Sequence, residues 1–195
     1  MSTSDPLSRE EARRLVAMAA SYGRPWSALR DRAALAIMYG CGCRSNEVRM
    51  LDLPDVRLTL HGMSIRVRSP KGIGRTKAPA RPREVGLNRV AREALGDWLE
   101  VRGTAPGPLF MTARGRRVCT SHWRRKIKPL ARAARIDRRV HCHGLRHTFA
   151  REMHDEGARI GVIQGALGHS SLDTTAIYLS SLGSPEIVAA TVGRE

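Results

Sequence analysis

The 195-residue sequence predicts a mainly helical (α+β) fold that contains a small three-stranded antiparallel sheet. Two features of the apolar pattern carry this prediction: a helical period over most of the chain, and a period of two between residues 56 and 87, which is typical of strands. Hydrophobic residues make up 42% of the chain, and no internal repeat or low-complexity linker divides it. We therefore expect one domain over residues 1–195, with residues 183–195 as a C-terminal tail.

Caps and helix breakers delimit the predicted helices. Ser8 and Glu11 have the spacing of a capping box, and Asn88 stands at the start of another segment with helical periodicity. A hydroxyl of Thr120 or Ser121 is predicted to cap a very basic helix. The predicted helices cover residues 8–23, 26–39, 44–51, 88–102, 120–135, 143–156, 160–167 and 172–181, and a short tail helix follows Pro185.

Three short strands are predicted between the third and fourth helices. Their apolar residues alternate, and a turn at His61 and Gly62 separates the first two strands. The alternating residues are Leu58 and Leu60, then Met63, Ile65 and Val67, then Val85 and Leu87. The loop at residues 69–82 is rich in Gly, Pro, Lys and Arg, so we expect it to project from the sheet and to take part in function.

The charge distribution indicates a polyanionic partner. The chain holds 34 Lys and Arg against 18 Asp and Glu, a formal net charge of +16. Residues 57–92 contain ten basic side chains and one acidic, and residues 111–151 contain thirteen basic and one acidic. Solvated helix faces are one explanation for such blocks. Two blocks separated by neutral or acidic segments fit better with two walls of one groove for nucleic acid.

The remaining composition predicts a cytoplasmic, nucleoid-associated protein with no membrane partner. The longest mostly apolar run, residues 33–42, is too short to cross a bilayer. The four cysteines are few for the length and fit a reducing compartment. Cys41 and Cys43, together with Cys142 and His143, raise zinc as an alternative, but paired zinc ligands are usually spaced more widely. We expect buried thiols, no metal and no cofactor.

Candidate chemistry begins with His143 and Arg146, which lie three residues apart and therefore on one face of a predicted helix. Arginine offers two parallel donors to phosphate oxygens, and histidine transfers a proton near neutral pH, so the pair suits a phosphate group. A chance pair in an arginine-rich chain is the alternative. Tyr178 lies between Ile177 and Leu179, where a half-buried core tyrosine fits the local sequence as well as a nucleophile does.

Three stretches of the sequence occur in a distinctive order and spacing. They are Gly-Cys-Arg-Ser-Asn-Glu at residues 42–47, His-Gly-Leu-Arg-His-Thr-Phe-Ala at 143–150, and Leu-Gly-His-Ser-Ser at 167–171 followed by Thr-Thr-Ala-Ile-Tyr at 174–178. Together they resemble the catalytic domain of the tyrosine site-specific recombinases, the phage integrase family. The resemblance extends from about residue 7 to residue 181 and implies the family's helical catalytic fold.

The resemblance implies a role for each phosphate-binding candidate. Arg44 and Arg146 would clamp the scissile phosphodiester and offset the charge of its transition state, and His169 would donate a further hydrogen bond. Lys71 would protonate the 5′ oxygen that leaves. Lys77 lies closer to the third strand and is the alternative general acid.

The resemblance also implies the nucleophile and its base. Tyr178 would attack phosphorus and form a 3′-phosphotyrosyl link, while His143 would accept the proton of the tyrosine hydroxyl. Glu47 is expected to orient Arg44 or to bind nearby backbone rather than to transfer protons. His141 and His147 are expected to form hydrogen bonds with residues of the site rather than to contact the substrate. No metal is required for this chemistry.

The implied function is site-specific DNA recombination: strands of double-stranded DNA are cut and rejoined, with integration, excision or inversion as the outcome. Four copies would act on two DNA sites, and the free protein would be a monomer whose tail docks on a neighbour in the assembly. In the basic helix, His122 and Trp123 are expected to be able to reach the DNA backbone. Two rival functions remain: a topoisomerase-like DNA relaxer, and a recombinase relative that binds DNA without cutting it.

Most relatives in this family carry a separate helical DNA-clamping domain of about a hundred residues before the catalytic one. The sequence contains no such N-terminal core-binding domain. A naturally minimal recombinase and a fragment of a longer protein are both consistent with this.

Overall fold

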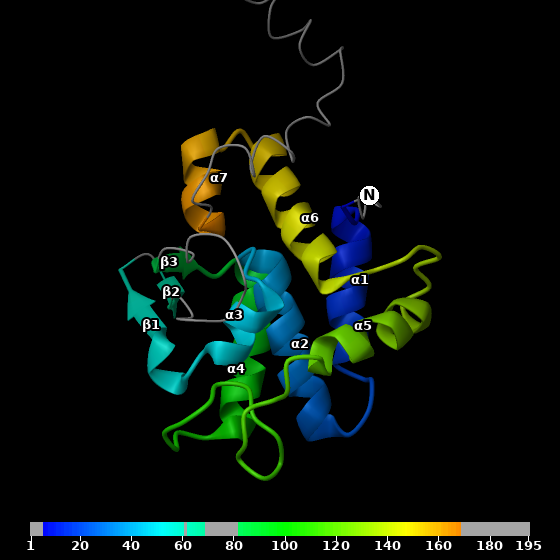
Figure 1. The fold of residues 1–195 in the computed structure, drawn as a ribbon, viewed down its shortest axis with the longest axis vertical. Coiled ribbons are helices and arrows are strands. Elements are labelled where there is room, and N and C mark those ends of the chain that lie inside the picture. The colour runs from blue at the N-terminus through cyan, green and yellow to red at the C-terminus, as the bar shows by residue number, and fades with distance from the viewer. Residues whose placement is uncertain (1–5, 61, 69–81, 169–195) are drawn as a thin grey trace, which may run out of the picture.

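The computed structural model describes residues 6–60, 62–68 and 82–168. Helices dominate this part of the chain, and a small sheet lies on the side opposite α5 (Figure 1). The elements in chain order are α1 (Arg9–Ala19), α2 (Pro25–Gly40), α3 (Ser45–Met50), the 3-10 turn η1 (Leu53–Asp55), β1 (Val56–Thr59), β2 (Gly62–Val67), β3 (Arg83–Gly86), α4 (Arg89–Arg102), α5 (His122–Ala133), α6 (Cys142–Asp155) and α7 (Ile160–Leu167). The predicted mainly helical fold with three strands is confirmed; the predicted helix at 172–181 and the tail lie outside the described residues.

The second half of helix α2 forms the centre of the molecule because it is apolar all round. Every side chain from Ala33 to Tyr39 is buried, and α1, α4 and α6 all pack against this helix. A helix that is apolar on every face is stable in water only when other elements surround it. The alanines of α2 let its neighbours approach closely, and Arg146 of α6 reaches the Gly42 carbonyl just beyond the end of α2.

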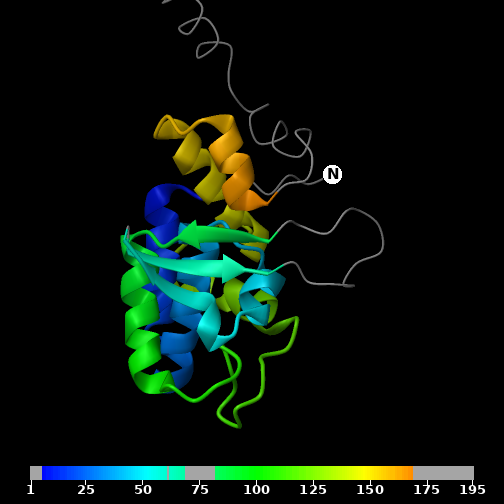
Figure 2. The ribbon, with the colours of Figure 1, turned by 90° about the vertical axis from the view of Figure 1, so that its left-hand side faces the viewer.

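The sheet has the order β1-β2-β3, with both pairs antiparallel (Figure 2). Ile65 of β2 pairs with Val56 on one side and with Val85 on the other, and both Ile65 and Val85 are buried. The predicted alternation therefore holds for β2 and β3. Leu58 and Leu60 are exposed instead, at 84% and 103%, because they lie at the end of β1 and in the turn that joins it to β2.

Most predicted caps are present. Ser8 and Glu11 form the capping box of α1: the Ser8 hydroxyl accepts the Glu11 N–H at 3.1 Å, and the Ser8 N–H donates to the Glu11 carboxylate at 2.8 Å. Asn88 accepts the Ala91 N–H at 2.9 Å at the start of α4. The prediction of a hydroxyl cap on α5 was wrong for Ser121. Its backbone is turn-like (φ −95°, ψ 0°) rather than extended, and its side chain makes no capping bond.

The cysteines are not uniformly buried. Cys41 and Cys43 are fully enclosed at the end of α2, as predicted. Cys119 is exposed because it lies in the turn before α5, so the prediction of a buried thiol was wrong there. Within residues 6–60, 62–68 and 82–168, no three His, Cys, Asp or Glu side chains are grouped as metal ligands, and no helix is both long and apolar enough to cross a bilayer.

Candidate active site

The structure brings three of the predicted catalytic residues to one place. Arg44 immediately precedes α3, and His143 and Arg146 lie in the first turns of α6. All three surround the buried carboxylate of Glu47 in α3. The other four candidates, Lys71, Lys77, His169 and Tyr178, lie outside the described residues.

The turn between α2 and α3 places Arg44, and it depends on Gly42. Gly42 has a φ of +63°, in the left-handed region that favours glycine. A Cβ atom at this position would stand 2.4 Å from the Phe149 ring and 2.9 Å from Leu167. The backbone of the turn is therefore pressed directly against α6 and α7, and a side chain on residue 42 would separate them.

Glu47 organises the arginines around it. Its Oε2 atom accepts the backbone N–H of Arg44 at 2.7 Å, and its Oε1 atom accepts a guanidinium N–H of Arg44 at 3.0 Å. This confirms that Glu47 both orients Arg44 and binds nearby backbone. Burial alone would raise the pKa of the Glu47 carboxyl, but the hydrogen bonds and charge of Arg83, followed by those of Arg44, lower it below its usual value. Glu47 is thus a buried carboxylate anion.

Arg146 is fully buried, and two backbone carbonyls hold its guanidinium. One Nη atom donates to the Gly42 carbonyl at 2.7 Å, and the other donates to the Leu167 carbonyl at 2.7 Å. Its Nη1 atom is 3.9 Å from Glu47 Oε2, which is ion-pair distance but beyond a hydrogen bond. Arg146 therefore joins the turn before α3 to the end of α7.

His143 and His147 stack edge to face one turn apart on α6, with ring centroids 4.7 Å apart. His143 is exposed at the surface, yet the atoms packed around its ring reduce its solvation. That effect, followed by the charges of Arg146 and Arg44, lowers the His143 pKa below its ordinary value. Reduced solvation, then the charge of His143 and of Arg146, lowers the His147 pKa to about 4. Both rings are neutral at pH 7, the state in which an imidazole can accept a proton.

The site thus combines two arginines from distant parts of the chain with a neutral imidazole. The chain matches the model of the phage integrase family over residues 6–183. The chain belongs to the phage integrase family. It is 35% identical over 156 residues to the tyrosine recombinase XerC of Shewanella amazonensis, covering 78% of this chain and 49% of XerC.

Solved structures of integrase-family recombinases share the fold. The crystal structure of XerA recombinase superposes with a TM-score of 0.77 at 33% identity and covers 100% of this chain and 66% of that one. The XerH site-specific recombinase, in a post-cleavage complex with its palindromic difH substrate, superposes with a TM-score of 0.77 at 23% identity over 98% of this chain and 54% of that one. This member of the family spans about half the length of the curated relatives it matches.

One residue of this integrase-family site was missed by the sequence reasoning. The Arg83 side chain, 7% exposed, donates from both terminal nitrogens to Glu47, at 3.1 Å to Oε1 and 2.9 Å to Oε2. A signal for it existed: Arg83 shares the face of its strand with Val85 and Leu87, both buried. A charged residue on the inward face of a strand needs a buried partner of opposite charge.

His122 and Trp123 do not face outward as predicted. Trp123 is buried, with its indole N–H 3.2 Å from Asp31 Oδ1, and His122 Nε2 lies 2.9 Å from the same oxygen. Asp31 is a buried residue of α2 that also pairs with Lys126 at 3.2 Å. These contacts attach α5 to α2, so the two aromatic residues anchor the basic helix instead of reaching beyond it.

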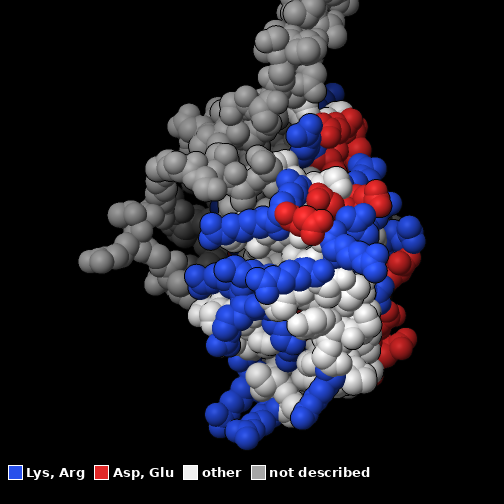
Figure 3. Space-filling view, turned by 90° about the vertical axis from the view of Figure 1, so that its right-hand side faces the viewer, with Lys and Arg blue, Asp and Glu red and all other residues white. Residues whose placement is uncertain are grey.

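The outward side of α5 remains strongly basic. Lys and Arg side chains gather over the side of the molecule that carries α5, while acidic side chains concentrate at the upper right of that view (Figure 3). The exposed basic residues of α5 are Arg124, Arg125, Lys128 and Arg132. This surface belongs to the second of the two basic blocks recognised in the sequence.

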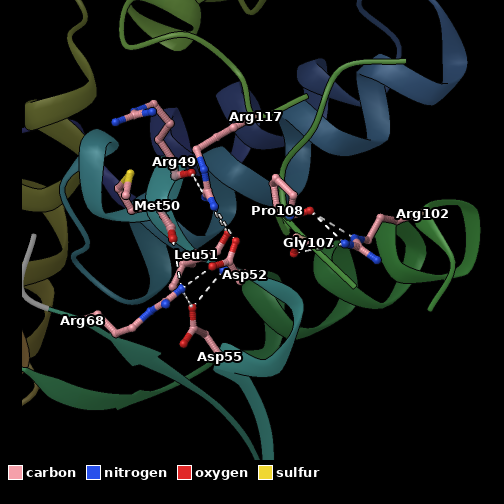
Figure 4. A network of polar contacts seen from close by, with 10 residues as sticks. All are labelled: Arg49, Met50, Leu51, Asp52, Asp55, Arg68, Arg102, Gly107, Pro108 and Arg117. Carbon is pink, nitrogen blue, oxygen red and sulfur yellow. Dashed lines mark hydrogen bonds and ion pairs between the residues drawn. The ribbon is translucent and has the colours of Figure 1, made fainter. Parts of the chain in front are cut away.

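A separate polar network fixes the ends of α3 and β2 (Figure 4). Arg68, directly after β2, donates at 2.6 Å to both Asp52 and Asp55. Arg117 donates to the carbonyls of Arg49 and Leu51 at 2.7 and 3.0 Å and also contacts Asp52. The network ties Arg68 to the C-terminal end of α3, the helix that Arg44 immediately precedes.

Proposed function

We propose that this protein cuts and rejoins double-stranded DNA in site-specific recombination. The observation that carries the proposal is the convergence of Arg44 and Arg146, about a hundred residues apart in sequence, on one buried carboxylate beside the neutral His143. Fixed cationic donors are suited to the charge that develops on a phosphodiester in its transition state. The name of the XerC relative and the DNA complex of XerH support the same reaction.

The proposed reaction begins with attack by the Tyr178 hydroxyl oxygen on phosphorus, while His143 accepts the hydroxyl proton. The bond from phosphorus to the 5′ oxygen breaks, and Lys71 gives that oxygen a proton. A 3′-phosphotyrosyl link remains, so the phosphodiester energy is kept for rejoining. The 5′ hydroxyl of a second strand then attacks this link and releases the tyrosine. His169 would donate a hydrogen bond to the phosphate throughout.

The basic surface of α5 would hold the DNA backbone, which supplies strong, salt-sensitive and sequence-independent affinity. The proposed assembly has four copies on two DNA sites, formed from free monomers, with residues 183–195 docking on a neighbouring copy. Light scattering with and without a DNA duplex tests this. A tetramer in the absence of DNA would contradict the proposed monomeric free state, and a complex that stays monomeric on paired sites would contradict the assembly.

The DNA flanking the gene is first sequenced for inverted repeats, and the reaction is then tested with a nicked duplex that carries such a repeat. A nick next to the scissile phosphate lets the 5′ end diffuse away and traps the covalent adduct. We expect a denaturation-resistant protein–DNA adduct with the wild type and none with Tyr178→Phe. An adduct that survives Tyr178→Phe, or a wild type that forms none, contradicts the proposal. Relaxation of supercoils without recombinant product would favour a topoisomerase-like activity. DNA binding without any adduct would favour a recombinase relative that does not cut DNA.

A substrate whose leaving group needs no proton shows which of the two lysines, Lys71 or Lys77, is the general acid. A 5′-thiolate leaves readily unprotonated, so replacing the bridging 5′ oxygen by sulfur should restore cleavage to Lys71→Ala. Lys77→Ala serves as the matched variant. Rescue of Lys77→Ala instead of Lys71→Ala would reverse the assignment.

A further inference from the structure

Arg83 of β3 holds both oxygens of Glu47, and its third nitrogen holds another element of the site. Its Nε atom donates to the Ala166 carbonyl at 2.6 Å, in the last turn of α7. The side chain is nearly enclosed, and a Cβ atom built at Gly168 would come within 2.8 Å of its guanidinium. Arg83 is therefore packed between α3 and the end of α7.

The backbone carbonyls at the end of α7 all have hydrogen-bond partners, and Arg83 provides one of them. The last four carbonyls of a helix have no partner within the helix. Here the Gly168 N–H lies 2.8 and 3.1 Å from the Gln164 and Gly165 carbonyls, and Arg83 and Arg146 bind those of Ala166 and Leu167. All four terminal carbonyls are satisfied, and two of them are satisfied by arginines that also surround Glu47. The chain reaches position 169 directly from this anchored end.

Arg83 also neutralises the buried negative charge of Glu47. Each Glu47 oxygen accepts one N–H from Arg44 and one from Arg83, which leaves Arg146 at 3.9 Å. A buried carboxylate that loses a partner must recruit another cation, because an uncompensated buried charge is strongly unfavourable. Arg146 is already within ion-pair distance. Without Arg83, we expect Glu47 to draw in Arg146 and to cancel more of the charge of Arg44.

We propose that Arg83 is a positioning residue for the reaction: by neutralising Glu47 and anchoring the end of α7, it keeps the charges of Arg44 and Arg146 directed at the phosphate. The inference rests on the proposed function, since it assumes that these two arginines bind the scissile phosphate. The Arg83 side chain is only 7% exposed and binds Glu47 and the Ala166 carbonyl, so we expect it not to contact DNA. Its removal should therefore slow the chemical step and leave DNA affinity almost unchanged.

The test measures adduct formation on the nicked duplex under single-turnover conditions, with DNA affinity and thermal unfolding measured in parallel. For Arg83→Met we expect a rate about 100-fold below wild type, the scale of losing one electrostatic stabiliser of a transition state, with DNA affinity within about threefold. Arg83→Lys should give an intermediate rate, because one ammonium cannot bridge both Glu47 oxygens and the Ala166 carbonyl. Equal wild-type and Arg83→Met rates per folded molecule would overturn the inference.

A double variant separates positioning from mere stability. In Arg83→Met/Glu47→Gln the side chain at position 47 is neutral, so it has no charge with which to recruit Arg146. We expect this double variant to form adduct faster than Arg83→Met. If Arg83→Met fails to fold, the inference predicts that the double variant folds and is faster than Glu47→Gln alone, whose amide would face an unneutralised Arg83. The inference is contradicted if the double variant forms adduct no faster than Arg83→Met or, where Arg83→Met does not fold, no faster than Glu47→Gln.

Arg102 provides the matched control. It is also a buried arginine that binds backbone carbonyls, and Figure 4 shows its contacts with Gly107 and Pro108. Its other partners are the carbonyls of Gly103 and Ala105, and none of the four belongs to the turn before α3 or to the end of α7. Arg102→Met should lower thermal stability without changing the adduct rate of the folded fraction. If Arg83→Met behaves like Arg102→Met, Arg83 has only a structural role. If the wild type itself forms no adduct, it is the proposed function that fails.

Discussion

Glu47 and Arg146, both buried, lie 3.9 Å apart, at ion-pair distance but without a hydrogen bond between them. Glu47 takes its donors from Arg44 and Arg83, and Arg146 gives its terminal nitrogens to the carbonyls of Gly42 and Leu167. Direct pairing would neutralise Arg146 within the protein. The observed arrangement keeps the guanidinium fixed by neutral acceptors, so its charge still acts on the surroundings.

The two carbonyl contacts of Arg146 predict a large cost for Arg146→Lys. A lysine ammonium cannot reach both carbonyls at once, so at least one buried acceptor loses its donor. We expect the free energy of unfolding to fall by about 2 to 4 kcal/mol. Urea unfolding followed by circular dichroism measures this. The control is Arg151→Lys on the exposed side of α6, which should change stability by less than about 0.5 kcal/mol. Equal losses in the two variants would contradict the prediction.

The lowered pKa of His143 predicts the pH profile of adduct formation. A general base must be deprotonated, and His143 loses its proton below the ordinary histidine pKa because of reduced solvation and the charges of Arg146 and Arg44. The rate should therefore already be level at pH 7 and fall only in acid. Single-turnover adduct formation between pH 5 and 8 measures this, with DNA affinity recorded at each pH as the control. A rate still rising steeply between pH 7 and 8 would contradict this assignment of the base.

His147 predicts a pH dependence of stability. Its pKa is about 4 in the folded protein, whereas an unfolded histidine titrates near 6.5. Between these values the unfolded chain binds more protons, so the stability contributed by the neutral ring is present above pH 6.5 and lost as the pH falls toward 4. The loss should amount to roughly 2 to 3 kcal/mol. Urea unfolding of wild type and His147→Gln between pH 6.5 and 4.5 tests this. If the free energy of unfolding falls with pH equally in both proteins, the prediction is refuted.

Short-range features of this fold were predictable from sequence, and long-range partners were not. The caps at Ser8 and Asn88 and the end of α6 depend on residues within a few positions of one another. The pairing of Arg83 with Glu47 spans 36 residues, and that of Asp31 with His122 spans 91. Periodicity shows that a charged side chain faces inward, but which partner it meets depends on how the helices and the sheet pack.

Gly42 illustrates the same division. Its place in the break between the predicted helices at 26–39 and 44–51 was evident from the sequence, but its contact with Phe149 was not. Gly42→Ala would force a Cβ into the Phe149 ring at a φ of +63°. We expect it to lower the free energy of unfolding by about 2 to 4 kcal/mol. Gly96→Ala is the control: nothing lies within 4 Å of a Cβ there, and alanine in mid-helix should stabilise α4 by about 0.5 to 1 kcal/mol. Losses of similar size at both positions would contradict the steric argument.

The exposed cations of α5 predict how salt affects DNA binding. Each Lys or Arg that neutralises a phosphate releases condensed counterions, so removing one should reduce the slope of log affinity against log salt by about 0.9. Arg124→Gln/Lys128→Gln should therefore reduce the slope by up to about 2 on a duplex of any sequence. The control is Arg89→Gln, because Arg89 on α4 already pairs with Glu93 at 3.1 Å. Fluorescence anisotropy from 50 to 300 mM salt measures both slopes. If the α5 variant keeps the wild-type slope, α5 does not contact the DNA backbone, and the DNA must lie on another face of the molecule.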